Sequence, residues 1–282
     1  MSTVPASAPR VSVVVPAYNN GAFIAATLDS ILAQDYGDFE LVIADHSSID
    51  GTQAVVDGYA SDPRVRILPP TPAGGGAPAN WSRVSAHARG EFIKLVCGDD
   101  LLAPQALRLQ VAAFDALPGV TAVACQRDLI DAAGRVIMRG RGLAGLQGVV
   151  EGRQAVRASV LAGTNIFGEP GCVLMRRDVF ERQGGWDGRF PYLIDQASYT
   201  RVMLQGRVVA VRQTLASFRI SATQWSVKLT RQQAEQAIGF HRELHRQHPG
   251  LLTSFELAVG NGRAWAMAHT RRLAYAWLKR RM

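Results

Sequence analysis

Acidic residues follow two apolar segments that are long enough to form buried strands. Asp45 comes directly after the run 39–44, and Asp99 and Asp100 follow the run 91–96. Magnesium and similar hard cations prefer oxygen ligands, and they commonly share one or two carboxylates with substrate phosphates. The adjacent Asp99 and Asp100 therefore suit a divalent cation beside a phosphorylated substrate.

Each of these acids also has a purely structural interpretation. Asp99 or Asp100 could cap the helix expected to begin near Pro104, because aspartate is a favoured N-cap residue. Asp45 could turn the chain through the serines that follow it. The spacing alone does not distinguish these roles from a binding role.

The elements that carry the acids alternate regularly over the first 120 residues. Strands are expected at 11–15, 39–44, 65–68 and 91–96, with helical segments between them. Such alternation is typical of βαβ units, which build a mostly parallel sheet flanked by helices. Ligands bind these sheets at the carboxyl ends of the strands, and Asp45, Asp99 and Asp100 all follow such ends.

The rest of the chain is less regular, and its character changes near residue 227. Residues 121–227 mix strand-like and helix-like segments, whereas 228–282 read as helical with one break at Pro249. We therefore expect an α/β domain over 1–227, with halves at about 11–120 and about 121–227. Residues 228–282 are expected to form a helical C-terminal extension.

Positive charge is concentrated in this extension. The chain has a formal net charge of +8, and the ten basic and three acidic residues from Lys228 onward account for +7. Aromatic and basic residues at helical spacing over 263–282 could lie on an anionic membrane surface. The alternative is that the aromatics pack on the domain while the arginines are solvated. No nucleic-acid recognition motif accompanies the charge, so we expect no nucleic-acid partner.

Composition excludes several classes of protein. With 48% hydrophobic and 19% charged residues, the chain can bury a core and does not resemble a disordered protein. Three cysteines, a low and odd number, fit a reduced, cytoplasmic protein. The N-terminal residues lack the apolar core of a signal peptide, and no apolar run approaches the length needed to span a bilayer.

Four sequence blocks in a fixed order resemble family two nucleotide-sugar glycosyltransferases, which are inverting enzymes with a GT-A fold. The blocks are VSVVVPAYNN, IADHSSIDGT, NWSRVSAHARGEFIKLVCGDD, and NIFGEPGCVLMRRDVFERQGGWD with the later LIDQASYTRV. The resemblance extends from Val11 to about Ser226. It implies a GT-A-like, Rossmann-type sheet with a nucleotide-sugar-binding half over 11–120 and an acceptor half over 121–227.

The resemblance also implies a role for individual residues, matched motif by motif. The implied donor-binding residues are Pro16, Ala17, Tyr18, Asp45, His46, Asn80, Trp81, Lys94, Asp99 and Arg219. Asp100 is the implied ligand of a divalent metal, Mg²⁺ or Mn²⁺. Asp195 is the implied catalytic base, and Glu169 lies in a segment that faces the acceptor.

The reaction implied by the resemblance is an inverting transfer of a sugar. The donor would be a nucleoside-diphosphate sugar of the UDP, dTDP or GDP type, and the acceptor a hydroxyl of a glycan or lipid-linked glycan. A role in the synthesis of cell-envelope polysaccharide follows from this substrate class. We expect a cytoplasmic enzyme, and peripheral attachment to the inner face of the plasma membrane stays open with the role of the basic extension.

Two departures from the family pattern keep other functions open. His46 stands where the family commonly has a second acid or an asparagine, and Ser221 stands where an FRxH-like motif has histidine. A non-catalytic relative that binds nucleotide-sugar or glycan is therefore one alternative, although Asp100 and Asp195 are retained. A sugar-phosphate nucleotidyltransferase is another, but no Gly-rich triphosphate loop ending in Arg or Lys lies near the first strand.

Overall fold

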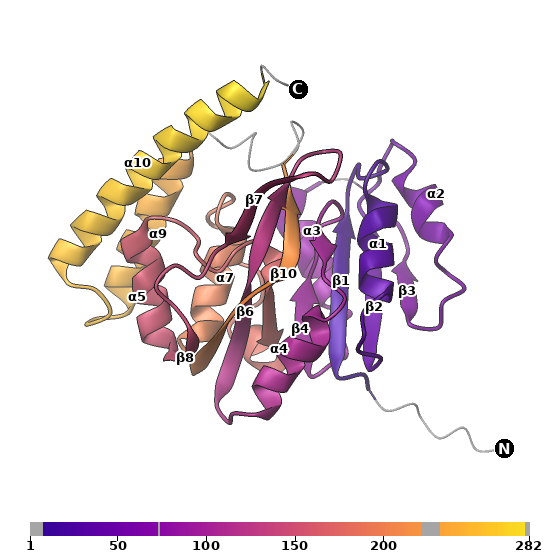
Figure 1. Cartoon of the computed structure of the whole chain (residues 1–282), viewed down its shortest axis with the longest axis horizontal. Coiled ribbons are helices and arrows are strands. Elements are labelled where there is room, and N and C mark those ends of the chain that lie inside the picture. Colours follow the sequence, from indigo (N-terminus) through magenta and orange to yellow (C-terminus); the bar gives the residue numbers. More distant parts are fainter. Residues whose placement is uncertain (1–7, 73, 221–231, 280–282) are drawn as a thin grey trace.

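The computed structural model describes residues 8–72, 74–220 and 232–279, together with the side chains up to residue 272. Its centre is one mixed sheet with helices packed against it (Figure 1). The predicted α/β fold is therefore confirmed. None of the helices in the described ranges is long and apolar enough to cross a membrane.

The first half alternates strand and helix as predicted. Its elements are β1 (Val11–Ala17), α1 (Ile24–Leu32), β2 (Phe39–Asp45), α2 (Thr52–Asp57), β3 (Val65–Leu68), α3 (Gly76–Ser85), β4 (Phe92–Leu95), β5 (Leu101–Leu102) and α4 (Ala106–Asp115). Four of these strands pair in parallel in the order β3-β2-β1-β4. Every residue of β1 and β2 is buried, as expected of apolar strands covered on both faces.

The second half continues the same sheet with strands of both directions. Its elements are β6 (Val120–Ile130), β7 (Val136–Arg141), β8 (Gly148–Glu151), α5 (Gly152–Ala162), the 3₁₀ helix η1 (Pro170–Cys172), β9 (Val173–Arg176), α6 (Arg177–Arg182), α7 (Ile194–Met203) and β10 (Arg207–Arg219). β9 is antiparallel to both β4 and β6, so it joins the two halves. β6 and β10 are parallel to each other.

The sheet register places the ends of the parallel strands together. Asp45, the last residue of β2, is paired with Ala17, the last residue of β1. The amide of His46 then donates to the carbonyl of Ala17 at 3.0 Å, which continues the pairing by one residue. The loop with Asp99 and Asp100 follows β4, the other neighbour of β1. The acids therefore lie beyond adjacent strands.

Two helices form the C-terminal extension, α9 (Gln233–Gln247) and α10 (Ser254–Lys279). They pack on each other, and α10 also packs on α5 (Figure 1). Phe240 and Leu244 from α9, with Leu251 and Leu252 from the following turn, belong to the main hydrophobic core. The predicted domain boundary near residue 227, like Ser221, lies outside the described residues, so the division into domains stays a prediction.

The contact between α5 and α10 depends on Gly163, which ends α5. Its φ of +65° is in the left-handed region, where L side chains are strained. A Cβ at this position would lie 2.4 Å from the amide nitrogen of Ala264 and 2.5 Å from the carbonyl carbon of Arg263. The close approach of α10 to the end of α5 therefore requires glycine.

We expect Gly163→Ala to destabilise the protein more than Gly145→Ala does. Gly145 also has a positive φ, +75°, but an added Cβ there would meet no atom within 4 Å. Gly145→Ala should therefore lower the free energy of unfolding only by the cost of the strained backbone, about 1–2 kcal/mol. Gly163→Ala should lower it further, because the added Cβ must also displace α10. Urea unfolding of both variants measures the difference. Equal losses would contradict the close packing of α10 on α5.

Candidate active site

Asp45 organises the loop that follows β2. The residue is buried, and its Oδ2 accepts a hydrogen bond from the Ser48 amide at 3.0 Å. Its Oδ1 accepts a second hydrogen bond from the hydroxyl of Ser48. Asn19, in the loop after β1, donates from its amide to the Ser48 hydroxyl oxygen at 2.8 Å. The loops after β1 and β2 are thus fastened to each other at the strand ends.

His46 connects the same edge to the segment that precedes α3. Its Nε2 lies 3.0 Å from the amide nitrogen of Gly74 and 2.7 Å from the carbonyl oxygen, while its Nδ1 lies 3.3 Å from the Thr71 hydroxyl. The ring of Tyr18 approaches His46 edge-on, with 6.3 Å between ring centroids, and Tyr18 is 50% exposed. An exposed aromatic ring at this edge is available to a planar ligand such as a nucleotide base.

Asn80 brings a buried polar group to the ends of β1 and β2. Its Nδ2 donates to the carbonyl of Ala17, the residue that follows Pro16, at 3.1 Å. Its Oδ1 is buried and has no hydrogen-bond partner among the described residues. Buried polar atoms are normally paired, so this oxygen indicates a place where a ligand or water can donate.

Two predicted donor-binding residues pack inward. Trp81 contacts Trp186 edge-on, with ring centroids 5.1 Å apart. Lys94 is fully buried within the sheet, where its Nζ donates to Gln110 Oε1 at 2.9 Å. Burial lowers the pKa of Lys94. The structure therefore gives Lys94 a contact in the core, where we expected a contact with the donor.

Arg219 holds the loop that carries the adjacent acids. Its amide donates to Asp100 Oδ1 at 3.1 Å, and its Nε donates to the carbonyl of Asp99 at 2.9 Å. Its Nη1 donates to the two carbonyls of the 131–132 turn, each at 3.1 Å. The guanidinium also lies over the ring of Phe23, 4.7 Å from its centroid. This cation therefore stabilises the backbone around both acids.

The acid pair fits a hard divalent cation that shares its coordination with a ligand. Burial, followed by the negative charge of Asp99, raises the pKa of Asp100 well above its usual range. A cation beside this carboxyl group would favour the ionised form. Across 8–72, 74–220 and 232–279, no three His, Cys, Asp or Glu side chains gather as a metal site. A divalent cation held by one or two carboxylates commonly completes its coordination with phosphate oxygens and water.

Asp195 lies in the first turn of α7 and has both carboxyl oxygens engaged. Oδ1 accepts from the amide of Gln196 at 2.7 Å, and Oδ2 accepts from Asn165 Nδ2 at 2.9 Å. Removal from water raises the pKa of Asp195 to about 7, and the charge of Glu169 acts in the same direction. The two hydrogen bonds and the charge of Arg127 lower it, so the carboxyl group titrates near neutral pH.

Glu169 lies beside Asp195 but forms its own ion pair. Arg127, on β6, donates from Nη2 to Glu169 Oε1 at 3.1 Å, and its Nε approaches Oε2. Asn165 fastens the same loop, because its Nδ2 also donates to the carbonyl of Gly168 at 2.9 Å. Sequence reasoning missed Asn165 and Arg127. Asn165 opens the NIFGEPG block and was visible as a polar side chain there, whereas no motif marked Arg127.

The structure brings two groups of acids, Asp99 with Asp100 and Asp195 with Glu169, to one region around Cys97. Burial is the largest cause that raises the pKa of this thiol. The next causes are the negative charges of four side chains, Asp100, Asp99, Asp195 and Glu169. The acid pair after β4 and the acid at the start of α7 therefore both lie close enough to Cys97 for their charges to act on its thiol. A carboxyl group with a pKa near neutrality can remove a proton, and a cation held by an acid pair would stabilise a departing anion.

Comparison with known proteins identifies the family of this chain. The family model described as glycosyl transferase family 2 matches residues 12–184. An uncharacterized protein of Mycobacterium tuberculosis is 34% identical over 222 residues, which cover 76% of this chain and 68% of that protein. A UDP-Glc:alpha-D-GlcNAc-diphosphoundecaprenol beta-1,3-glucosyltransferase of Escherichia coli is 33% identical over 36% of this chain and 40% of its own length. Six other curated relatives are matched over 11–38% of their own length.

Solved structures share the fold over nearly the whole chain. S. aureus TarS in complex with UDP-GlcNAc has a TM-score of 0.73 and 18% identity, over 93% of this chain and 74% of that one. A mannosyltransferase from Pyrobaculum calidifontis in complex with GDP-Man and Mn2+ has a TM-score of 0.64 and 21% identity, over 97% and 81% of the two chains. At these identities the likeness concerns the fold, and it confirms the predicted GT-A type.

We expect the Asp195 carboxyl group to titrate near pH 7. Carbon-13 NMR of aspartate-labelled protein measures this, and Asp195→Asn identifies the resonance. Glu169→Gln should lower the pKa of Asp195, because the charge of Glu169 raises it. Glu181→Gln, at an exposed glutamate that pairs with Arg177 on α6, is the matched control and should leave the titration unchanged. A wild-type pKa near 4 would contradict the described environment.

Proposed function

Because the chain belongs to glycosyl transferase family 2 and is thus a glycosyltransferase, we propose that it inverts the configuration of a sugar transferred from a nucleoside diphosphate to a hydroxyl group. The observation that carries this proposal is that Asp195, with a pKa of about 7, lies with Asp99 and Asp100 in the acidic surroundings of Cys97. Asp195 is the proposed general base, and Asp100 is the proposed metal ligand.

The proposed reaction is a single displacement at the anomeric carbon. The ionised Asp195 carboxylate accepts the proton of the acceptor hydroxyl, and the hydroxyl oxygen forms a bond to the anomeric carbon. The bond from that carbon to the diphosphate oxygen breaks on the opposite side, so the configuration inverts. A base with a pKa near 7 is ionised often enough at neutral pH and still basic enough to accept the proton.

The departing diphosphate lies on the side of Asp99 and Asp100 in this proposal. When bound there, Mg²⁺ or Mn²⁺ would supply positive charge that stabilises the leaving group. Arg219 contributes by holding the loop of both acids through its hydrogen bonds to the backbone. This supports a positioning role for Arg219, because its guanidinium is occupied by the carbonyls of the 131–132 turn.

The nucleotide is proposed to bind along the ends of β1 and β2. Tyr18 offers an exposed ring, and Asn80 offers a buried acceptor without a partner among the described residues. Pro16, Ala17, Asp45 and His46 form the surrounding backbone and polar wall. UDP, dTDP and GDP sugars stay the candidate donors, and the two solved neighbours hold UDP-GlcNAc and GDP-Man.

The proposed acceptor is a hydroxyl of a glycan or a lipid-linked glycan, which would approach Asp195 from the side of Glu169. The E. coli relative is named for an acceptor linked to diphosphoundecaprenol, which supports this class. A role in cell-envelope polysaccharide synthesis at the cytoplasmic face of a membrane follows from such an acceptor. Trp265 on α10 is 55% exposed, which leaves it available for surface contact.

We expect Asp195→Asn to reduce turnover by about 10²–10⁴-fold while donor binding stays nearly intact, because the amide cannot accept the proton. Release of nucleoside diphosphate from a nucleotide sugar, with water as the simplest acceptor, measures turnover, and calorimetry measures binding. Asp178→Asn, at an exposed acid that pairs with Arg182, is the matched control. The wild-type rate should rise with pH through about 7, as Asp195 ionises. Full turnover by Asp195→Asn would exclude the proposed base.

Calorimetric titration with UDP, GDP and dTDP, each with and without Mn²⁺, tests the donor site. We expect one nucleotide to bind in a manner that depends on the cation, and Asp100→Asn to weaken this binding because it removes a charged ligand. Asp115→Asn, at an exposed acid paired with Arg10, should bind as the wild type does. An equal nucleotide affinity with and without Mn²⁺ would contradict the proposed metal site. Folded protein that binds none of the nucleotides would favour the non-catalytic alternative.

A further inference from the structure

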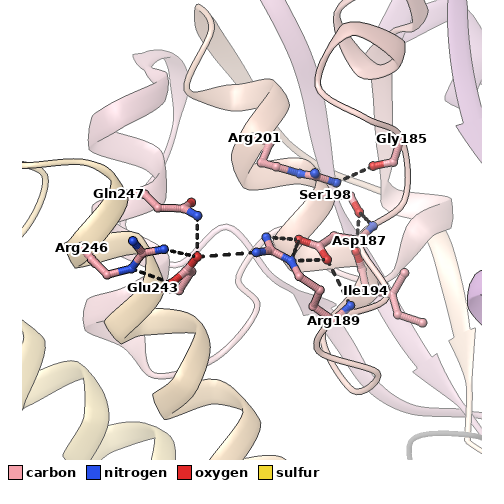
Figure 2. Close-up of polar contacts among 9 residues, drawn as sticks. All are labelled: Gly185, Asp187, Arg189, Ile194, Ser198, Arg201, Glu243, Arg246 and Gln247. Carbon is pink, nitrogen blue, oxygen red and sulfur yellow. Dashed lines mark hydrogen bonds and ion pairs between the residues drawn. The ribbon is translucent and has the colours of Figure 1, made fainter.

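The loop that leads into α7 is tied to the C-terminal extension as well as to α7 itself (Figure 2). Asp187 donates from its amide to the hydroxyl oxygen of Ser198 on α7, at 2.9 Å. Arg189 donates from Nε and Nη2 to the two carboxyl oxygens of Asp187, at 3.0 and 2.7 Å. Its Nη1 lies 3.5 Å from Oε1 of Glu243 on α9. One arginine thus joins the loop to α9.

The residues that follow in this loop make further contacts with α9. The amide of Tyr192 donates to Gln236 Oε1 at 2.7 Å. The ring of Phe190 packs edge-on against Phe240, with centroids 5.8 Å apart. Because Tyr192 is only three residues before Asp195, these contacts fix the point at which the chain enters α7.

Arg271 on α10 connects this loop to a second segment. Its Nη1 donates to the hydroxyl oxygen of Tyr192 at 2.8 Å, and its Nη2 donates to the hydroxyl oxygen of Thr164. Its guanidinium carbon also lies 5.9 Å from the centroid of the Tyr192 ring. Thr164 directly precedes Asn165, whose side chain donates to Asp195. A single guanidinium therefore links the segment that holds Asn165 to the segment that leads into Asp195.

We propose that Arg271 is a positioning residue for the transfer reaction, and that the C-terminal extension thereby completes the catalytic site. This inference rests on the proposed role of Asp195 as the base. Arg271 and Asp195 both lie beyond residues 12–184, which the family model matches. A displacement of the reacting groups by about 1 Å can lower a rate about 100-fold, so a link of this kind suffices to affect turnover.

The groups around Asp195 show how the effect of Arg271 would be transmitted. The charged side chains that act on Asp195 are Glu169 and Arg127. The charge of Asp195 in turn raises the pKa values of the nearby Tyr199 and Cys97 side chains. Arg271 reaches the carboxyl group through Thr164 and Asn165 on one side and through Tyr192 on the other. Loss of its two hydrogen bonds frees the segment that holds Asn165, and weakening of the Asn165 hydrogen bond raises the pKa of Asp195.

Arg271→Met tests this inference. We expect turnover of the nucleotide sugar, measured as release of UDP or GDP with water as acceptor, to fall by up to about 100-fold with donor affinity unchanged. The acidic limb of the pH–rate profile should move to higher pH, and carbon-13 NMR should give a higher Asp195 pKa. Arg242→Met removes the same charge from an exposed position on α9 and should change none of these.

Milder variants keep the test valid if Arg271→Met does not fold. Thr164→Val and Tyr192→Phe each remove one acceptor of Arg271 with almost no change of shape, and the pair together should reproduce the shift of the Asp195 pKa. Hydrogen exchange should increase in peptides covering 164–169 and 186–195 in these variants, and not in Arg242→Met.

The outcomes separate this inference from the proposed function. Hydrogen exchange and the NMR titration do not depend on turnover, so they report on Arg271 in any case. Full activity of Asp195→Asn would contradict the proposed function but not the contacts of Arg271. Unchanged exchange and an unchanged Asp195 pKa in the Arg271 variants would overturn the inference. A loss of turnover that only follows a lower melting temperature would overturn it as well, because it would indicate a purely structural role.

Discussion

The arrangement of this protein depends on one electrostatic constraint, the concentration of acidic side chains in a region with little water. Ionised carboxylates are unfavourable in such surroundings and repel one another. The surroundings of Asp195 and Asp100 differ in how they stabilise the ionised carboxylate. The protein surrounds Asp195 with hydrogen-bond donors and with the charge of Arg127, whereas the backbone amide of Arg219 donates to Asp100 and leaves its pKa high. These environments fit the proposed roles of Asp195 as the base and of Asp100 as the metal ligand.

The sheet makes this meeting of acids possible through one antiparallel strand. β9 pairs with β4 on one side and with β6 on the other, so only this strand separates the strand before Asp99 from the strand that carries Arg127. The 165–169 loop and η1 lead directly into β9, which places Glu169 close to the acid pair. The two halves of the sheet therefore share a single hydrophobic core.

The sequence was most informative where chemistry and local structure coincide. Asp45, Asp99 and Asp100 were identifiable because an apolar run followed by an acid marks the end of a buried strand, and the sheet brings such ends together. Lys94, by contrast, was assigned to the donor only because its block resembles the family pattern. It belongs to the same block as Asp99, but the pleat of β4 directs it into the core toward Gln110.

Other parts of the site could not be predicted because they depend on contacts between distant segments. Asn165 and Asp195 are 30 residues apart, and Arg271 is 107 residues from Thr164. Neither pair has a spacing that indicates a contact, since helix and strand periodicities report only on neighbours within one element. The basic extension was visible as a charged segment, yet its contacts with the loop before α7 required the folded structure.

The position of β10 has a consequence for the order in which a growing chain can complete this site. Asp99 and Asp100 precede the strand that secures them by more than a hundred residues, since Arg219 ends β10 and β10 also pairs with β5 next to the acids. A nascent chain that has emerged only as far as α7 carries every acid of the site but lacks the strand and the arginine that hold the acid loop. The acids can therefore reach their final geometry only late in synthesis, after β10 has joined the sheet.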